Sequence, residues 1–232
     1  VHTIVRMMRL ISEIVCPGIL LLGEVVMEPE KVVPYFGTVE KPECHMLYNV
    51  TTMATTWHTV ATRDVSLLKK QLDIVNGLPK DYVFLNYLRC HDDIGWGLDY
   101  ATLQQEGIEE RSHKKYLNDY FQGDEIGQVN DYSYKKDPDK SPDSRYIHRG
   151  AMRWERAAKC DSPRTVEGQI FRQLDKLEKI RKTEKAFMTN ADTWTVETWD
   201  NSILCIGRYY DGDKIYGLFN FSEYDKTAWI NE

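Results

Sequence analysis

The sequence has 232 residues and a net charge of −6 at pH 7, which is enough chain for one large domain or two small ones. A mildly acidic chain without a long lysine or arginine run is a poor candidate for binding nucleic acid or an anionic membrane surface. No apolar stretch reaches the roughly 18 residues that a membrane span needs. We therefore expect neither a nucleic-acid partner nor a membrane partner.

Five cysteines are scattered singly along the chain. No Cys-x-x-Cys pair and no Cys/His ligand spacing occurs, so the sequence predicts no metal site. No glycine-rich phosphate loop is present either, and we expect no cofactor. An odd number of cysteines fits free thiols in a reducing compartment better than a disulfide framework, and we expect a cytoplasmic protein.

Helical patterns and short apolar runs alternate through the first part of the chain. Helices are expected over His2–Val15, Lys31–Phe36, Thr51–Ala61 and Asp64–Val75. Strands are expected over Gly18–Leu22, Met46–Asn49 and Tyr82–Leu88. All-apolar runs such as the first are typical of strands that are covered on both faces. Their alternation with helices predicts an α/β fold with parallel strands.

The middle of the chain is more polar. A helix is expected over His113–Phe121, and Asp124–Gly150 is rich in loop-forming residues. A strong amphipathic helix follows over Pro163–Lys185. We expect its apolar stripe to pack into the core, and the stripe consists of Val166, Ile170, Leu174, Leu177 and Ile180.

The last part of the chain changes character. Trp194–Trp199, Ile203–Tyr210 and Lys214–Phe221 alternate apolar and polar residues with a period of two, and Asp211–Asp213 is a hairpin turn signal between the last two. The sequence predicts a small antiparallel β unit that begins near Phe187.

Ionisable residues directly follow two of the expected strands. Glu24 follows the first, and His91, Asp92 and Asp93 follow the third. In an α/β barrel the active site is built at the carboxyl ends of the strands, so both groups would face one mouth. Two adjacent carboxylates and an imidazole are costly to bury without a polar ligand. The alternative is a solvated loop or a helix N-cap, and the residues alone leave both interpretations open.

Several segments together resemble a known family. The segments Leu21–Glu24 (LLGE) and Arg89–Trp96 (RCHDDIGW) resemble two signature regions of the α-amylase superfamily, glycoside hydrolase family 13. The doubled aspartate followed by Ile-Gly-Trp is similar to amylosucrases in particular. Further matches follow in the same order at Gly123–Gly127, Val129–Asp131, Asp143–Arg149, Gly168–Phe171 and Asn220–Tyr224. The resemblance covers nearly the whole chain, and its motifs are specific only in combination.

The resemblance implies the C-terminal part of a (β/α)8 TIM barrel followed by a small antiparallel β domain. Residues 1–186 would hold strands five to seven and later helices of the catalytic barrel, and residues 187–232 would hold the incomplete C-terminal β domain. The family's covering insertion and eighth strand have no counterpart before Gly123, so a gap is expected near residues 122–123.

Carried over by position, the resemblance implies a role for each of five residues. Glu24 would be the general acid/base, and Asp92 would stabilise the transition state. His91 would hydrogen-bond the glucosyl unit, Asp93 would help to shape the sucrose site, and Arg145 would close the bottom of the pocket through a charged pair. The implied enzyme is retaining: it cleaves sucrose through a covalent glucosyl intermediate and transfers glucose to an α-1,4-glucan or to water.

Other interpretations stay open beside this one. The chain is also compatible with an α-amylase, an α-glucosidase or a sucrose phosphorylase. The family's nucleophilic aspartate would precede Val1, so a non-catalytic carbohydrate-binding fragment is a further alternative, and we expect the chain to be inactive if it is a true fragment.

Overall fold

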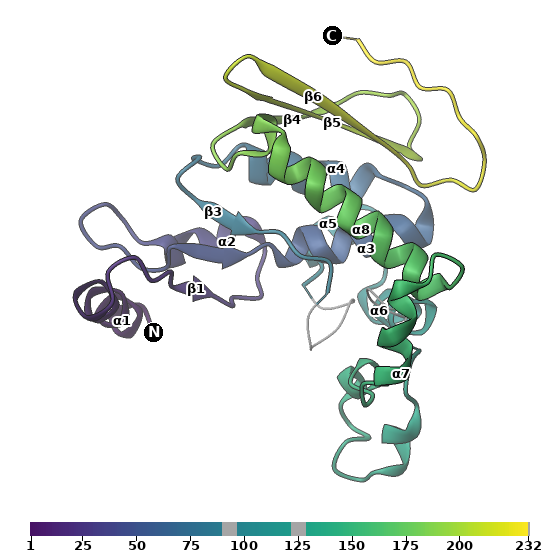
Figure 1. Ribbon diagram of the computed structural model, residues 1–232. Helices are drawn as coiled ribbons and strands as arrows, with labels where there is room; N and C mark the ends of the chain where they lie inside the picture. Colours follow the sequence, from purple (N-terminus) through teal and green to yellow (C-terminus); the bar gives the residue numbers. More distant parts are fainter. Residues whose placement is uncertain (90–96, 122–128, 232) are drawn as a thin grey trace.

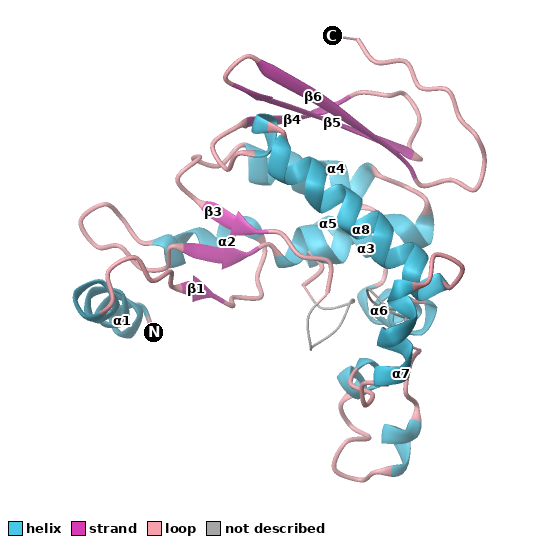
Figure 2. Cartoon of the chain, in the orientation of Figure 1, coloured by secondary structure: helices cyan, strands magenta, loops and turns pink. Residues whose placement is uncertain are grey.

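Two separate three-stranded sheets organise the protein. The computed structural model describes residues 1–89, 97–121 and 129–231. The strands are β1 (Leu22–Gly23), β2 (Met46–Tyr48), β3 (Val83–Leu85), β4 (Asp192–Val196), β5 (Ile203–Tyr210) and β6 (Asp213–Asn220). The first three form a parallel sheet and the last three an antiparallel sheet, and Figure 2 shows helices around and between them.

The helices connect the strands and follow them along the chain. The α-helices are α1 (His2–Val15), α2 (Pro29–Val32), α3 (Val50–Thr62), α4 (Ser66–Asn76), α5 (Tyr100–Gln105), α6 (Glu110–Tyr120), α7 (Trp154–Ala157) and α8 (Val166–Thr183). Short 3-10 helices include η1 (Val33–Phe36), η3 (Ser144–His148) and η5 (Lys185–Phe187). Within the described ranges, no helix combines the length and apolar character that crossing a bilayer requires.

The parallel sheet has the order β1-β2-β3, with β2 paired on both sides. Leu47 of β2 is fully buried and pairs with Gly23 on one side and Phe84 on the other. The predicted parallel α/β arrangement is therefore confirmed, although each strand is shorter than its apolar run. Because parallel strands need a crossover between them, each connection here carries helix.

The expectation that the first strand is covered on both faces is wrong. Leu20 is 63% exposed and Ile19 is 46% exposed. β1 lies at the edge of the described sheet, and no other described strand pairs with it beyond β2. Only Leu22 of the expected strand lies in β1, and Ile19 and Leu20 precede it. The apolar run therefore ends in a strand, but its side chains lack the neighbours that burial requires.

Gly23 allows β1 and β2 to approach each other closely. A Cβ at this position would lie 2.7 Å from Leu47 Cδ2 and 2.8 Å from Cys44 Sγ, distances that real Cβ atoms essentially never show. Leu47 and Cys44 are both buried, so neither side chain has free space to move into.

Helix α1 has the predicted bounds and is attached through a buried carboxylate. Glu43 is fully buried; its Oε2 lies 2.7 Å from His2 Nδ1, and its Oε1 accepts a hydrogen bond from Arg6 Nε at 3.0 Å. Arg9 also donates to the main-chain oxygen of Glu43 at 3.1 Å. A buried charge is stable only when it is paired, so these contacts fix α1 against the segment before β2.

Helices α3 to α6 share one apolar core. Its buried members are Ala54, Leu67, Leu98, Leu103, Leu117 and Phe121. Beside it, His58 of α3 is buried and its Nδ1 lies 2.8 Å from Nε2 of His113 on α6. Burial lowers the pKa of His58 to about 4, with His113 adding to the decrease and Asp64 opposing it. Burial lowers the pKa of His113 as well.

Helix α8 corrects a second expectation. The stripe on this helix was expected to pack into the core, yet Val166 is 63% exposed and Leu177 is 60% exposed. The described contacts of α8 are mainly with the short helices on either side of it in the chain, η5 and the 3-10 turn Ala158–Asp161. Ile170 and Leu174 of the stripe are partly buried, and none of its five members is fully buried, so the amphipathic spacing is present without a buried apolar face.

The antiparallel unit contains the three predicted strands, and β4 starts two residues and ends three residues before the predicted Trp194–Trp199. β5 pairs with β6 from Ile203↔Asn220 to Tyr210↔Asp213. Asp211 (φ 48°) and Gly212 (φ 88°) both have positive φ, which is typical of a type I′ hairpin turn. The sheet lies against α4, as Figure 1 shows. Val65 and Leu68 pack there with Leu204 of β5.

We predict that Gly23→Ala lowers the free energy of unfolding by about 1–3 kcal/mol, because an added methyl group overpacks the β1–β2 contact. Urea denaturation measures the change. Gly77→Ala is the control, since a Cβ there meets nothing closer than 3.3 Å. Equal effects of the two substitutions would contradict the close approach at Gly23.

We also predict that acid weakens the fold through His58. The folded protein favours neutral His58, so the unfolded state binds more protons at low pH. The stabilisation is complete above the unfolded pKa of 6.5 and falls as the pH drops toward about 4. Between pH 7 and pH 5 the loss is about 2 kcal/mol.

Denaturation at several pH values, on wild type and His58→Gln, measures this contribution. Other histidines titrate in both proteins. The difference between their pH dependences therefore isolates the contribution of His58 and its contact with His113. A variant with the same pH dependence as wild type would show that His58 does not supply it.

Candidate functional site

A polar residue stands directly after each strand of the parallel sheet. Glu24 follows β1, Asn49 follows β2 and Asn86 follows β3. Because the three strands run in the same direction, all three residues lie at the carboxyl edge of the sheet. In α/β sheets, ligands bind at this edge, where the strands end and the loops begin.

Glu24 is exposed at this edge. Within the described residues, its carboxylate has no hydrogen-bond or ion-pair partner. It follows Gly23, whose close contact with Leu47 fixes the backbone at the end of β1. A carboxyl group that no other side chain engages is accessible to a substrate, and general acid/base chemistry requires such access.

Asn49 and Asn86 join the ends of the next two strands. Asn49 is buried, and its Nδ2 donates to Asn86 Oδ1 at 2.8 Å. Its main-chain N–H donates to the oxygen of Leu85 at 3.0 Å. The Oδ1 of Asn49 is buried without a hydrogen-bond partner. This bridge fixes the edge of the sheet between Glu24 and the segment after β3.

Aromatic rings stand beside the asparagine bridge. The rings of Tyr48 and Tyr87 meet edge to face, with centroids 5.0 Å apart. These tyrosines and asparagines were not among the expected site residues. All four lie inside the strands expected over Met46–Asn49 and Tyr82–Leu88, and the sequence held no signal that β2 and β3 end before the asparagines.

The three site residues expected after β3, namely His91, Asp92 and Asp93, lie outside the described residues. Arg89, just before them, is described and partly buried. The structure therefore shows where the segment of these residues leaves the sheet, at the same edge as Glu24.

Arg145 lies in η3, on the arm that Figure 1 draws in teal-green below α7. Its Nε donates to Asp143 Oδ1 and its Nη2 to Asp143 Oδ2, each at 2.9 Å. These hydrogen bonds are the main cause that lowers the pKa of Asp143. The expectation was a charged pair that closes a pocket. The fork with Asp143 is such a pair in form, and its relation to a bound sugar stays a prediction.

His148 lies three residues after Arg145, at the end of η3. Burial lowers the pKa of His148 to about 4, and the positive charge of nearby Arg89 lowers it further. Both ring nitrogens are buried without a hydrogen-bond partner. A neutral imidazole thus lies within electrostatic range of Arg89.

The described part of the chain contains no metal-binding cluster. Across residues 1–89, 97–121 and 129–231, no group of three His, Cys, Asp or Glu side chains is placed to hold an ion.

Sequence comparison finds distant relatives among sugar enzymes. No protein-family profile matches the sequence. A trehalose synthase of Thermus thermophilus is 30% identical over 111 residues, covering 48% of this chain and 11% of that protein. A glucosylglycerate phosphorylase of Spirochaeta thermophila is 28% identical over 94 residues, covering 40% of this chain and 16% of that protein. The aligned part is thus a small fraction of each relative.

Structure comparison finds the same kind of protein. An α-amylase of H. orenii superposes with a TM-score of 0.61 at 20% identity, over 95% of this chain and 47% of that one. A sucrose 6F-phosphate phosphorylase of Thermoanaerobacter thermosaccharolyticum gives a TM-score of 0.58 at 16% identity, over 88% of this chain and 48% of that one. This chain therefore has the fold of about half of each neighbour.

Together the relatives and neighbours are α-amylase-type enzymes. They support the superfamily level of the resemblance, and they do not single out amylosucrase. The described parts of residues 1–231 share the fold of part of that α-amylase, and the last three strands of this chain form an antiparallel sheet.

We predict that Asn86→Ala lowers the free energy of unfolding by about 1 kcal/mol, because the buried amide of Asn49 loses its acceptor. Asn86→Asp keeps an acceptor oxygen and should lose less. Thermal or urea denaturation of both variants measures the difference. If the alanine and aspartate variants are equally stable, the bridge does not hold the two strand ends together.

Proposed function

We propose that Glu24 is the general acid/base of a retaining, α-glucoside-active enzyme of the α-amylase type. The observation that carries the proposal is the place of this carboxylate: exposed, unpaired within the described chain, and directly after a strand at the carboxyl edge of a parallel sheet. The similarity to α-amylase-type proteins in sequence and in fold supports the same assignment.

The chemistry follows from what a glycosidic bond needs. Glu24 protonates the leaving oxygen as the bond to the anomeric carbon breaks, and a second carboxylate attacks that carbon from the other side. In retaining enzymes the two carboxyl groups stand about 5–5.5 Å apart, and the first later removes a proton from the acceptor. In the second step, Glu24 therefore acts as a base while the acceptor takes the glucosyl unit from the enzyme.

The remaining expected residues complete this proposal. Asp92 stabilises positive charge on the sugar ring in the transition state, and His91 hydrogen-bonds the same glucosyl unit. Asp93 shapes the site for the leaving group. Arg145, held by Asp143, closes the bottom of the glucosyl pocket. The burial of His148 beside Arg89 supports a position for this arm next to the end of β3.

The proposed donor is sucrose, and the proposed acceptor is the end of an α-1,4-glucan or water, as in amylosucrases. The doubled aspartate before Ile-Gly-Trp supports this choice. A phosphorylase that uses inorganic phosphate as acceptor is the second candidate. Two of the similar proteins, a glucosylglycerate phosphorylase and a sucrose 6F-phosphate phosphorylase, favour it.

We predict that Glu24→Gln lowers turnover of sucrose on the order of 10²–10⁴-fold, because amide nitrogen cannot protonate the leaving oxygen. Fructose release measures the rate. With α-glucosyl fluoride, whose leaving group needs no proton, the first step should be affected far less. Glu30→Gln, an exposed carboxylate on α2, is the matched control and should keep the wild-type rate. Near-native turnover of sucrose by Glu24→Gln would exclude the assignment.

The acceptor is identified by the products. We expect fructose together with longer α-1,4-glucan or free glucose, in amounts independent of inorganic phosphate. Glucose 1-phosphate that forms only when phosphate is added would instead establish the phosphorylase. Binding of sugar without any product, unchanged in Glu24→Gln, would establish a carbohydrate-binding role in place of catalysis.

A further inference from the structure

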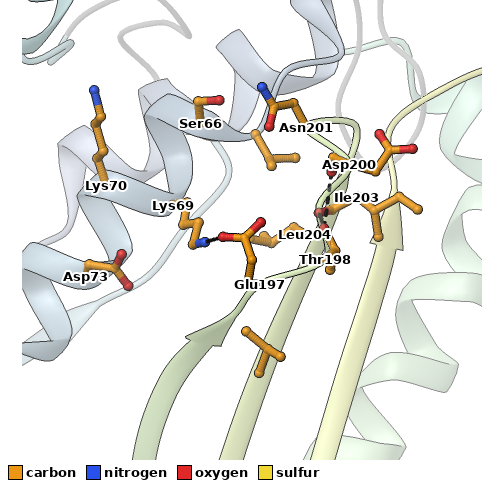
Figure 3. A pocket seen from close by; sticks show the side chains of 12 residues that line it. Ser66, Lys69, Lys70, Asp73, Glu197, Thr198, Asp200, Asn201, Ile203 and Leu204 are labelled. Carbon is orange, nitrogen blue, oxygen red and sulfur yellow. Dashed lines mark hydrogen bonds and ion pairs between the residues drawn. The ribbon is translucent and has the colours of Figure 1, made fainter. Parts of the chain in front are cut away.

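A second candidate site lies away from the carboxyl edge of the parallel sheet. A cavity of about 290 Å³ opens between α4 and the turn that joins β4 to β5, as Figure 3 shows. Its volume is near the lower limit of small-molecule sites, which suits a single ring-sized group. None of Glu24, Asn49, Asn86 or Arg145 lines it.

The cavity combines an apolar base with polar walls. Val65 and Leu204 belong to the buried cluster between α4 and the antiparallel sheet. Above them, Lys69 pairs with Glu197 across the cavity, as Figure 3 shows. The side chains of Ser66 and Asn201 also line it, and within the described residues neither has a hydrogen-bond partner.

The turn beside this cavity holds an unusual tryptophan. Trp199 has a φ of 55°, and it is 64% exposed. Left-handed backbone is unfavourable for a bulky residue, and glycine or asparagine would adopt it at lower cost. Trp199 stands between Thr198 and Asp200, which both line the cavity, although its own side chain does not.

Surrounding contacts keep the turn in this conformation. The N–H of Trp199 donates to Glu197 Oε1 at 3.0 Å. Thr198 Oγ1 donates to the main-chain oxygens of Asp200 at 3.1 Å and Ile203 at 2.9 Å. Backbone strain that persists because its surroundings fix it is a recognised sign of a functional residue. Here the strained position presents a large aromatic face to solvent.

We propose that Trp199 and the adjacent cavity form an accessory saccharide-binding site. Sugars carry apolar C–H faces and a rim of hydroxyl groups. The exposed indole supplies a flat apolar surface for one sugar unit of a chain. The side chains of Ser66 and Asn201, with the Lys69–Glu197 pair, supply hydrogen-bonding partners for the hydroxyls of a neighbouring unit in the cavity. The class of ligand rests on the proposed function, and the most direct candidate is an α-1,4-glucan chain.

The experiment measures binding of maltohexaose to the whole chain by NMR. The indole N–H signal of Trp199, assigned by its loss in Trp199→Phe, should shift on titration. The dissociation constant should be the same in Glu24→Gln, because the accessory site lies apart from the sheet edge. A normal shift in a protein that fails every glycosyl-transfer assay would support this site independently of the proposed function.

Trp199→Gly separates binding from folding. Glycine accepts the positive φ, so the variant should keep or raise the unfolding midpoint. It should bind maltohexaose about tenfold more weakly, because one aromatic contact with the sugar is lost. Trp199→Phe should keep part of the affinity, and Trp229→Gly, which removes another exposed tryptophan, should keep all of it.

Results of two kinds would overturn the proposal. One is an absence of binding at Trp199, seen as an indole signal that does not move or as an affinity that Trp199→Gly leaves unchanged. The other is a clear loss of stability in Trp199→Gly, which would show that the indole packs against the fold and is kept for that reason.

Discussion

The pairing of β2 on both of its sides is the constraint on which the parallel sheet and the candidate site depend. Leu47 is fully buried between Gly23 and Phe84, so β1 and β3 are fixed by the same three-residue strand. Their common direction brings Glu24, Asn49 and Asn86 to one edge. Glu43, just before β2, adds the attachment of α1. A change at Leu47 would therefore disturb both the core and the site.

The antiparallel unit is attached by different forces. Leu204 packs against Val65 and Leu68, and polar contacts surround this small apolar cluster. Lys69 pairs with Glu197, and Thr195 donates to Asp73 at 2.6 Å. Exposed ion pairs contribute little stability, about 0–1 kcal/mol each, so the apolar cluster carries most of the attachment. The cavity beside Trp199 lies among these polar contacts, between α4 and the β4–β5 turn.

Local patterns in the sequence were sufficient for most of the longer elements and insufficient for their burial. The period of α1 and the alternation of β5 and β6 are local properties, and these bounds agree closely with the structure. The exposure of Leu20 and Val166 depends on which distant segment covers them, and periodicity holds no such information. The same holds at the candidate site. A glutamate after a strand could be recognised, but the contact of Asn49 with Asn86 spans 37 positions and had no local signal.

The type I′ turn at Asp211 and Gly212 has a consequence for the order in which the chain folds. β5 and β6 pair residues that are close in sequence, so their loop closes at little entropic cost, and hairpins of this kind form in about 1–10 μs. β1 and β2 pair across an intervening helical segment, and β3 joins only after two further helices. Non-local parallel pairing of this kind is slow. We therefore expect the hairpin to be complete while the parallel sheet is still forming, so that α4 meets a preformed partner surface during folding.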